Sequence, residues 1–324
     1  MTRPALVAVD DLAKHFPLPR RGLGLRTAVR AVDGVSFAVA PGEVLGLVGE
    51  SGSGKSTVGR LALRLIDPTR GRVRFEGHDI TAERPRALRP LRRAMQMVFQ
   101  DPYASLNPRR SVGEAIGEVL RLHRIGVRAD RRERTGALLA KVGLAAADMT
   151  RMPREFSGGQ RQRIAIARAL AVEPRFLVAD EPVSALDVSV QAGILALLRS
   201  LQEELHLAML FISHDLSVVE VMADRVMVLY LGRVMEVGPT RTIFTAPRHP
   251  YTAGLLAAAP RLHGVRPAGV TLRDEIPSPA NPPSGCVFRT RCPFAVPECA
   301  TTIPAPRPLG PGHTMACLRD DLRF

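Results

Sequence analysis

Gly49-Glu50-Ser51-Gly52-Ser53-Gly54-Lys55-Ser56 matches the pattern GxxxxGK[ST] and decides the fold. The apolar run Val44–Val48 precedes it, and a helical pattern over Lys55–Ile66 follows. Glycines let backbone N–H groups turn towards phosphate oxygens, and a helix N-terminus adds partial positive charge. We expect a phosphate-binding loop in which Lys55 reaches the β- and γ-phosphates and the Ser56 hydroxyl binds Mg²⁺. A chance glycine-rich turn is the alternative, which the flanking strand and helix disfavour.

Strand and helix patterns alternate on both sides of this loop as far as about residue 237, which predicts an α/β fold. Residues 111–172 differ, because they carry three helical patterns (111–123, 131–142 and 158–172) and no strand pattern, as in a helical insertion. Val226–Tyr230 and Val234–Val237 look like a closing antiparallel pair. The other expected strands are Val35–Val39, Val73–Phe75, Met95–Phe99, Phe176–Asp180 and Ala208–Ser213, and Gln191–Leu205 is a further expected helix.

Two carboxylates end the apolar strand Phe176–Asp180. Strands of a phosphate-binding α/β sheet end near the ligand crevice. Asp180 is therefore expected to hold Mg²⁺, and Glu181 to polarise an attacking water. Such a pair alone also fits a solvated strand end, and the phosphate loop is what favours the catalytic interpretation.

Ser157-Gly158-Gly159-Gln160 precedes another helical pattern and fits a capping box between Ser157 and Gln160. Its glycines also suit a phosphate at the helix N-terminus, so a plain cap and an anion site both remain open. Gln100 and His214, each after an apolar strand, are unremarkable when taken singly.

The order of these pieces resembles the ATP-binding subunits of ABC transporters over residues 5–260. The resemblance implies a P-loop ABC ATPase domain with a RecA-like core, an antiparallel β subdomain and an inserted helical subdomain at about 100–172. It also implies a head-to-tail dimer, in which the phosphate loop of one subunit and the Ser-Gly-Gly-Gln helix of the other enclose ATP. One departure is Phe156, where most of the family has leucine, and we expect it to pack as an apolar residue.

Carried over by residue, the resemblance makes Glu181 the general base, His214 the switch histidine and Gln100 a contact of Mg²⁺ and water. Asp187 would link the two sites of the dimer, and Phe16 is the candidate for stacking on adenine. The expected nucleotide-binding residues are Phe16, Gly49, Glu50, Ser51, Gly52, Ser53, Gly54, Lys55, Ser56, Thr57, Ser157, Gly158, Gly159, Gln160 and Asp187.

A narrower resemblance, to dipeptide and oligopeptide importer ATPases, comes from 99–109, 180–191 and Arg248-His249-Pro250-Tyr251-Thr252. The second (F-type) ATPase subunit of dipeptide importers is most similar. This narrower resemblance implies ATP-driven peptide import, with nickel or glutathione as alternative cargo. The implied partners are a related ATPase subunit in a heterodimer, two membrane permease subunits and an extracytoplasmic peptide-binding protein, with no direct cargo contact.

All four cysteines lie in a proline- and glycine-rich tail, as Cys286, Cys292, Cys299 and Cys317. Four thiolates suit tetrahedral zinc or an iron–sulfur cluster, and close cysteine pairs typical of zinc are missing. Gly285-Cys286-Val287-Phe288 and Arg291-Cys292-Pro293 resemble the importer extension, which favours a [4Fe-4S] cluster. Zinc and unligated thiols remain alternatives. We expect domains at 1–260 and 261–324, the second being this small extension.

Charge and hydropathy limit which partners and cellular locations the protein can have. The net charge is +14, which permits nucleic acid or an anionic membrane as partner. Aromatic residues make up only 4% and do not interleave with basic ones, so a nucleic-acid ATPase is the weaker alternative. No apolar run reaches the ~20 residues of a membrane helix. We expect a peripheral protein on the cytoplasmic face of the inner membrane. The basic loop 17–30 has no assigned role.

Overall fold

The computed structural model describes residues 4–19, 28–258, 270–272 and 275–324, so most of the basic loop 17–30 falls outside the described residues. The chain divides into two compact units. Ala40–Glu43 and Ala82–Leu210 belong to the helical unit; Pro4–Val39, Val44–Thr81 and Phe211–Phe324 form the phosphate-loop unit. Strand β8 (Ala208–Ile212) begins in the first and ends in the second.

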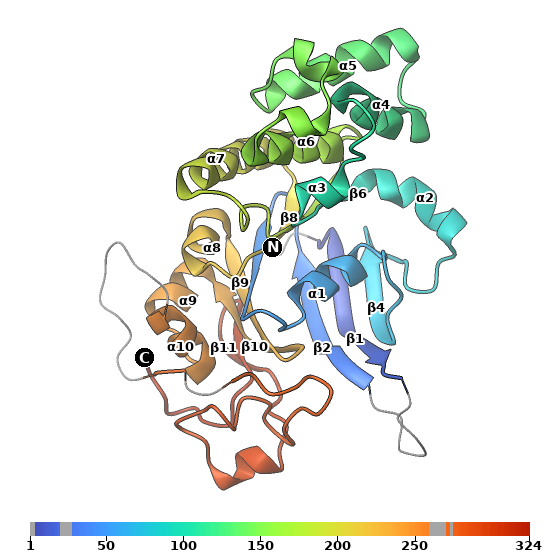
Figure 1. Cartoon of the computed structure of the whole chain (residues 1–324). Coiled ribbons are helices and arrows are strands. Elements are labelled where there is room, and N and C mark those ends of the chain that lie inside the picture. Colours follow the sequence, from blue (N-terminus) through green and yellow to red (C-terminus); the bar gives the residue numbers. More distant parts are fainter. Residues whose placement is uncertain (1–3, 20–27, 259–269, 273–274) are drawn as a thin grey trace. The chain divides into compact units, whose positions relative to one another are not determined.

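An antiparallel sheet of the phosphate-loop unit has the order β2-β1-β4-β5 (Figure 1). Val9 of β1 lies opposite Phe37 on one side and Val73 on the other, and all three side chains are buried. The strands are β1 (Val7–Pro17), β2 (Ala28–Val39), β4 (Arg70–Phe75) and β5 (His78–Asp79).

The phosphate loop belongs to a second, mixed run of strands with the order β11-β12-β10-β9-β3. β3 is parallel to β9. β9 is antiparallel to β10, which confirms the pair that the sequence predicted. All five residues of β3 are apolar or glycine, and all five are buried, as expected for a central strand. The elements are β3 (Val44–Val48), α1 (Lys55–Ala62), α8 (Leu216–Met222), β9 (Arg225–Tyr230), β10 (Arg233–Pro239), α9 (Thr240–Thr245), α10 (Pro250–Ala258), a 3₁₀ turn (Pro297–Ala300), β11 (Arg307–Gly310) and β12 (His313–Met315).

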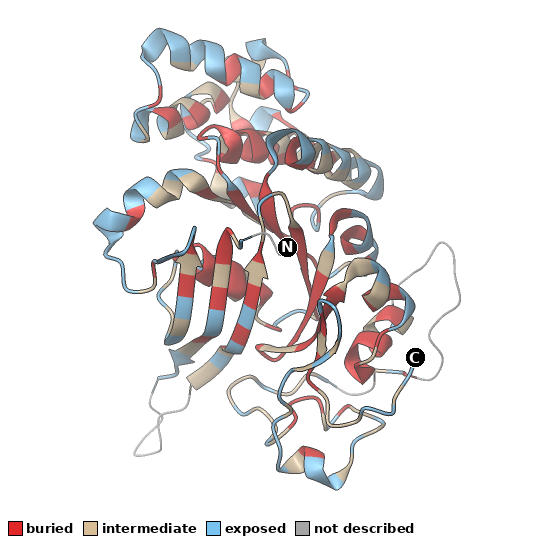
Figure 2. Ribbon diagram, turned by 180° about the vertical axis from the view of Figure 1, so that it is seen from behind, coloured by how far each residue is buried: buried red, intermediate tan, exposed pale blue. Residues whose placement is uncertain are grey.

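The helical unit carries five helices of ten or more residues and the strands β6 and β7, which pair in parallel. In Figure 2 the ribbon of α6 is largely buried, and its residues Ile164, Ile166 and Ala167 are fully enclosed. Its elements are α2 (Pro85–Ala94), β6 (Met95–Val98), α3 (Pro102–Ser105), α4 (Val112–Leu122), α5 (Arg128–Lys141), 3₁₀ turns (Ala146–Thr150 and Pro153–Glu155), α6 (Gly158–Leu170), β7 (Phe176–Asp180) and α7 (Val188–Leu205).

The architecture confirms the expected α/β class, and one predicted helix boundary was wrong. Helix α1 ends at Ala62 rather than Ile66, because Arg64 adopts a left-handed conformation (φ 51°) that terminates the helix. The tail, for which the sequence predicted no strand or helix, contributes β12, which pairs with β10 through Glu236 and Met315. The domain boundary at residue 260 stays a prediction.

Candidate functional site

The phosphate loop ends at α1, whose first residue is Lys55. The Lys55 ammonium is 5% exposed and donates to the carbonyls of Gly49 (2.8 Å) and Glu50 (3.0 Å). Ser53 N also donates to Glu50 O at 3.2 Å, which closes the loop. The loop therefore encloses a lysine charge at a helix N-terminus, the arrangement that binds phosphate.

Two glycines are required by this geometry. Gly49 (φ 153°) would place a Cβ 2.2 Å from the carbonyl oxygen of Leu229. Gly54 (φ 103°) precedes α1, and a Cβ there would lie 2.0 Å from Ala31 O. Any side chain at either position would displace the loop from the strands that hold it.

The Ser53 hydroxyl is the clearest sign of a ligand. Its side chain is 2% exposed, and its oxygen has no hydrogen-bond partner among the described residues. A buried hydroxyl without a partner costs free energy, so its retention favours a partner supplied by a ligand. Ser56 and Thr57, in the first turn of α1, are half-buried.

Glu50 is held from outside the loop by two residues, Tyr251 and Arg291, that the sequence motifs did not connect with the loop. The Tyr251 hydroxyl accepts a hydrogen bond from Glu50 N at 3.0 Å. The Arg291 guanidinium makes two hydrogen bonds to the Glu50 carboxylate, at 2.7 and 3.0 Å. The sequence contained Arg291 in the motif Arg291-Cys292-Pro293, but nothing there indicated its partner.

The two carboxylates of the helical unit lie at the end of β7. Asp180 is 1% exposed. Glu181 adopts a left-handed conformation (φ 47°), which is strained for a residue other than glycine and is common at functional sites. Gln100 Nε2 donates to Glu181 Oε2 at 2.9 Å. The structure therefore brings together two of the predicted catalytic residues.

The predicted capping box at the start of α6 is present. Ser157 Oγ accepts from Gln160 N at 3.3 Å, and Gln160 Oε1 accepts from Ser157 N at 3.0 Å. A Cβ on Gly159 would lie 2.3 Å from Val190 Cγ1, so this glycine allows α6 to approach α7. Phe156 is 3% exposed and packs under the guanidinium of Arg151, 4.3 Å from its ring centroid.

The other predicted residues lie at exposed positions. His214 follows β8, and Asp187 is the N-cap residue of α7. Phe16 is 41% exposed near the end of β1, with the Lys14 ammonium 5.2 Å from its ring centroid. The loop residues, Phe16 and His214 belong to the phosphate-loop unit, whereas Gln100, Ser157–Gln160, Asp180, Glu181 and Asp187 belong to the helical unit.

The four cysteines form no disulfide with one another, and Cys286 and Cys299 are buried, whereas Cys292 and Cys317 are half-buried. Burial raises the pKa of Cys286 to about 11 and that of Cys292 to about 12, and the other thiols add to each rise. Cys286 N donates to Cys299 O at 2.8 Å, which draws two of them together. Within the described part of the chain, no three His, Cys, Asp or Glu side chains are placed to hold a metal ion.

Two known families match the chain. Residues 32–184 match the ABC transporter family, and residues 235–299 match the oligopeptide/dipeptide transporter C-terminal region. A Brucella ovis protein named as a peptide import ATP-binding protein is 54% identical over 99% of this chain and 100% of its own length. The oligopeptide transport ATP-binding protein AppF of Bacillus subtilis is 50% identical over 96% of each chain.

Solved structures agree with these sequence relatives. The ATP-binding cassette MJ0796, as a dimer in a post-hydrolysis state with ADP and Pi, is 30% identical with a TM-score of 0.65. It covers 72% of this chain and 99% of its own. The protein cbiO1 of Clostridium perfringens, part of the cbiONQ transporter complex, is 28% identical with a TM-score of 0.63 over 74% of this chain and 90% of its own.

Proposed function

This chain belongs to the ATP-binding subunits of ABC transporters, and we propose that it energises the import of di- and oligopeptides. The observation that carries the cargo class is the match of residues 235–299 to the oligopeptide/dipeptide transporter C-terminal region, in addition to the ATPase cassette. The chain is an ATPase, as its family requires. A role on nucleic acid is not favoured, because the relatives are named for peptide transport.

The phosphate loop would bind the nucleotide. Lys55 would exchange its two carbonyl partners for the β- and γ-phosphates, and the buried Ser53 hydroxyl would gain its missing partner. Ser56, Gln100 and Asp180 offer the oxygen ligands that Mg²⁺ prefers. When bound, Mg²⁺ would neutralise charge on the terminal phosphates.

Glu181 would act as general base towards the attacking water. Its hydrogen bond to Gln100 supports this role, because the amide orients the carboxylate. His214 would contact the γ-phosphate as the switch histidine. Asp187 would connect the two sites of a dimer, and Phe16, exposed beside Lys14, would stack on adenine.

A second ATPase subunit would complete the site. The N-terminus of α6, with two glycines at its start, offers backbone N–H groups to an anion. In the proposed arrangement it faces the γ-phosphate held by the partner subunit. The solved MJ0796 cassettes are dimeric, and for this chain we propose a heterodimer with a related subunit.

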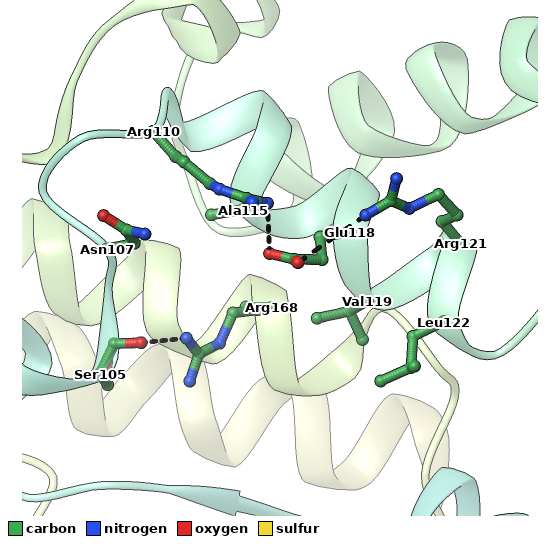
Figure 3. Close-up of a pocket in the computed structure, with 9 residues that line it drawn as sticks. All are labelled: Ser105, Asn107, Arg110, Ala115, Glu118, Val119, Arg121, Leu122 and Arg168. Atoms are coloured by element: carbon green, nitrogen blue, oxygen red, sulfur yellow. Dashed lines mark hydrogen bonds and ion pairs between the residues drawn. The ribbon is translucent and has the colours of Figure 1, made fainter.

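A pocket of about 390 Å³ in the helical unit suits a segment of a membrane permease (Figure 3). Figure 3 shows Arg110 and Arg121 flanking Glu118, at 2.7 and 3.8 Å, with Val119 and Leu122 beside them. Leu122 is 76% exposed. An apolar rim with surplus positive charge would take a short amphipathic helix with acidic or carbonyl groups.

The proposed location is the cytoplasmic face of the membrane, beside two permease subunits and in series with an extracytoplasmic peptide-binding protein. Across the described residues, no helix is long and apolar enough to cross a membrane. In this arrangement the cargo would pass through the permeases, and this chain would not touch it.

We also propose that the four cysteines ligate a [4Fe-4S] cluster. The proposal is supported by the placement of all four thiols in one small segment, residues 286–317, where Cys286 N donates to Cys299 O at 2.8 Å. Four cysteine thiolates are the donor set of such a cluster. When bound, the cluster would serve to hold the segment together.

Uptake of a labelled dipeptide into cells tests the proposed function. Deletion of the gene should abolish uptake, the intact gene should restore it, and a Glu181→Gln copy should not. Normal dipeptide uptake in the deletion strain, together with lost uptake of nickel or glutathione, would overturn the peptide assignment while leaving the ATPase role intact.

A further inference from the structure

The C-terminal extension touches the phosphate loop through one ion pair. Arg291 Nη1 and Nη2 each donate to a different oxygen of Glu50, at 2.7 and 3.0 Å. The Arg291 side chain is only 5% exposed, and that of Glu50 is 24% exposed. A two-point, largely buried guanidinium–carboxylate contact fixes both distance and orientation, unlike a surface ion pair.

An aromatic cluster packs beside the Arg291–Glu50 ion pair. Phe288, three residues before Arg291, packs on the rings of Tyr230 and Tyr251, each with centroids 5.3 Å apart. Tyr251 in turn accepts a hydrogen bond from Glu50 N. The side chain and the backbone amide of Glu50 are thus both held by residues outside the loop motif, and one of these, Arg291, belongs to the extension.

Glu50 is central to the loop itself. Its carbonyl accepts hydrogen bonds from the Lys55 ammonium and from Ser53 N. Displacement of Glu50 would therefore move the two groups that meet the nucleotide phosphates. Without Arg291, the Glu50 carboxylate would also add negative charge beside a polyanionic ligand, which weakens its binding.

We propose that Arg291 is a positioning residue for ATP, and that through it the C-terminal extension forms part of the nucleotide site. Arg291 acts on the loop and not on the reacting atoms, so it affects nucleotide affinity rather than the hydrolytic step. This inference assumes only that the phosphate loop binds ATP, and it is independent of the transported cargo.

The test is a titration of purified protein with a fluorescent ATP analogue, combined with steady-state ATPase kinetics. Arg291→Gln should weaken nucleotide affinity and raise KM by about fivefold to twentyfold, with kcat within about twofold of the parent. Arg291→Lys keeps the charge and loses the two-point contact, so its nucleotide affinity should lie between those of the parent and of Arg291→Gln. Arg289→Gln is the matched control, because the described contacts of Arg289 are to Ser284 within the extension.

A double-mutant cycle with Glu50→Gln separates this role from general destabilisation. If Arg291 acts only through Glu50, the double variant should bind ATP about as well as Glu50→Gln alone. Additive losses, or an unchanged affinity in Arg291→Gln, would overturn the proposal. If Arg291→Gln fails to fold, Glu50→Gln tests the pair from the loop side, and parental affinity there overturns it. A parent protein that binds no nucleotide would instead overturn ATP binding itself.

Discussion

Gln100 Nε2 lies 2.9 Å from Glu181 Oε2, which joins the side chain that follows β6 to the one that follows β7. The two strands are parallel neighbours, with Val98 opposite Ala179. Their carboxyl ends therefore meet at one edge of the sheet, where α/β proteins bind ligands. The pair provides a base and an orienting amide without a long-range rearrangement inside the helical unit.

Glu181→Gln should bind ATP with near-parental affinity and hydrolyse it at least about 100-fold more slowly. The amide keeps the size of the side chain but cannot accept a proton from water. With hydrolysis blocked, ATP should hold the ATPase pair together, which size-exclusion chromatography of the pair with MgATP would show. Hydrolysis at a near-parental rate would remove Glu181 from the role of base.

Gln100→Ala should lower kcat by about tenfold and leave nucleotide affinity within about twofold, because it removes an orienting contact but no phosphate ligand. Steady-state kinetics across a range of Mg²⁺ concentrations provide the measurement. Gln96→Ala is the control, since Gln96 lies on β6 and its amide bonds to the Arg92 carbonyl. Equal effects of the two substitutions would contradict a specific role for Gln100.

Stability should fall in mild acid because of His249. Burial lowers the pKa of the His249 imidazole to about 4, whereas the unfolded chain titrates near 6.5. The unfolded state therefore binds more protons as the pH falls below 6.5, and the folded state loses stability until about pH 4. For this group alone the free energy of unfolding should be about 2 kcal/mol lower at pH 5 than at pH 7.

Urea unfolding at both pH values measures this difference. His249→Asn should reduce the pH dependence, because asparagine retains an acceptor for Tyr251 N and does not titrate. The exposed His206→Asn is the control and should leave the dependence as it is. Identical pH dependence in parent and His249→Asn would contradict the assignment.

Leu122→Glu should prevent assembly with the membrane permeases while ATP affinity remains unchanged. The substitution places a charge at the exposed apolar rim of the Figure 3 pocket, where burial against a partner would be costly. Co-purification of the permeases with tagged subunit reports assembly. Val127→Glu, also exposed at 65% but not among the residues lining that pocket, is the control. Intact complexes with Leu122→Glu would contradict the proposal that a permease segment docks in this pocket.

Protein purified without oxygen should contain about four iron atoms and four sulfides per chain. Metal analysis, acid-labile sulfide and an absorption spectrum test this together, and Cys292→Ser should lower the iron content. Zinc in place of iron, or no metal in fresh protein, would exclude the cluster and leave the nucleotide site unaffected.

Local sequence determined the elements of the nucleotide machinery. The strand–loop–helix around Lys55, the capping box of Ser157 and the buried strand ending at Asp180 each follow from short-range rules. Each of these elements depends on residues only a few positions away. The features that define them are a glycine at a required φ, a hydroxyl three residues before a backbone amide, and a run of apolar residues. These local elements could therefore be predicted from the sequence, and the resemblance that their motifs carry gave the family and the candidate catalytic residues.

Only the tertiary structure decided which distant residues meet. Glu50 and Arg291 are 241 positions apart, and their contact depends on the pairing of β12 with β10 and on the packing of Phe288 against Tyr251. Neither residue carries a local signal for the other, because a salt bridge has no sequence period and its partner is selected by the folded backbone. The sequence alone thus predicted the parts that we propose to bind and hydrolyse ATP, and the fold determined that Arg291 of the cysteine-bearing extension contacts one of them.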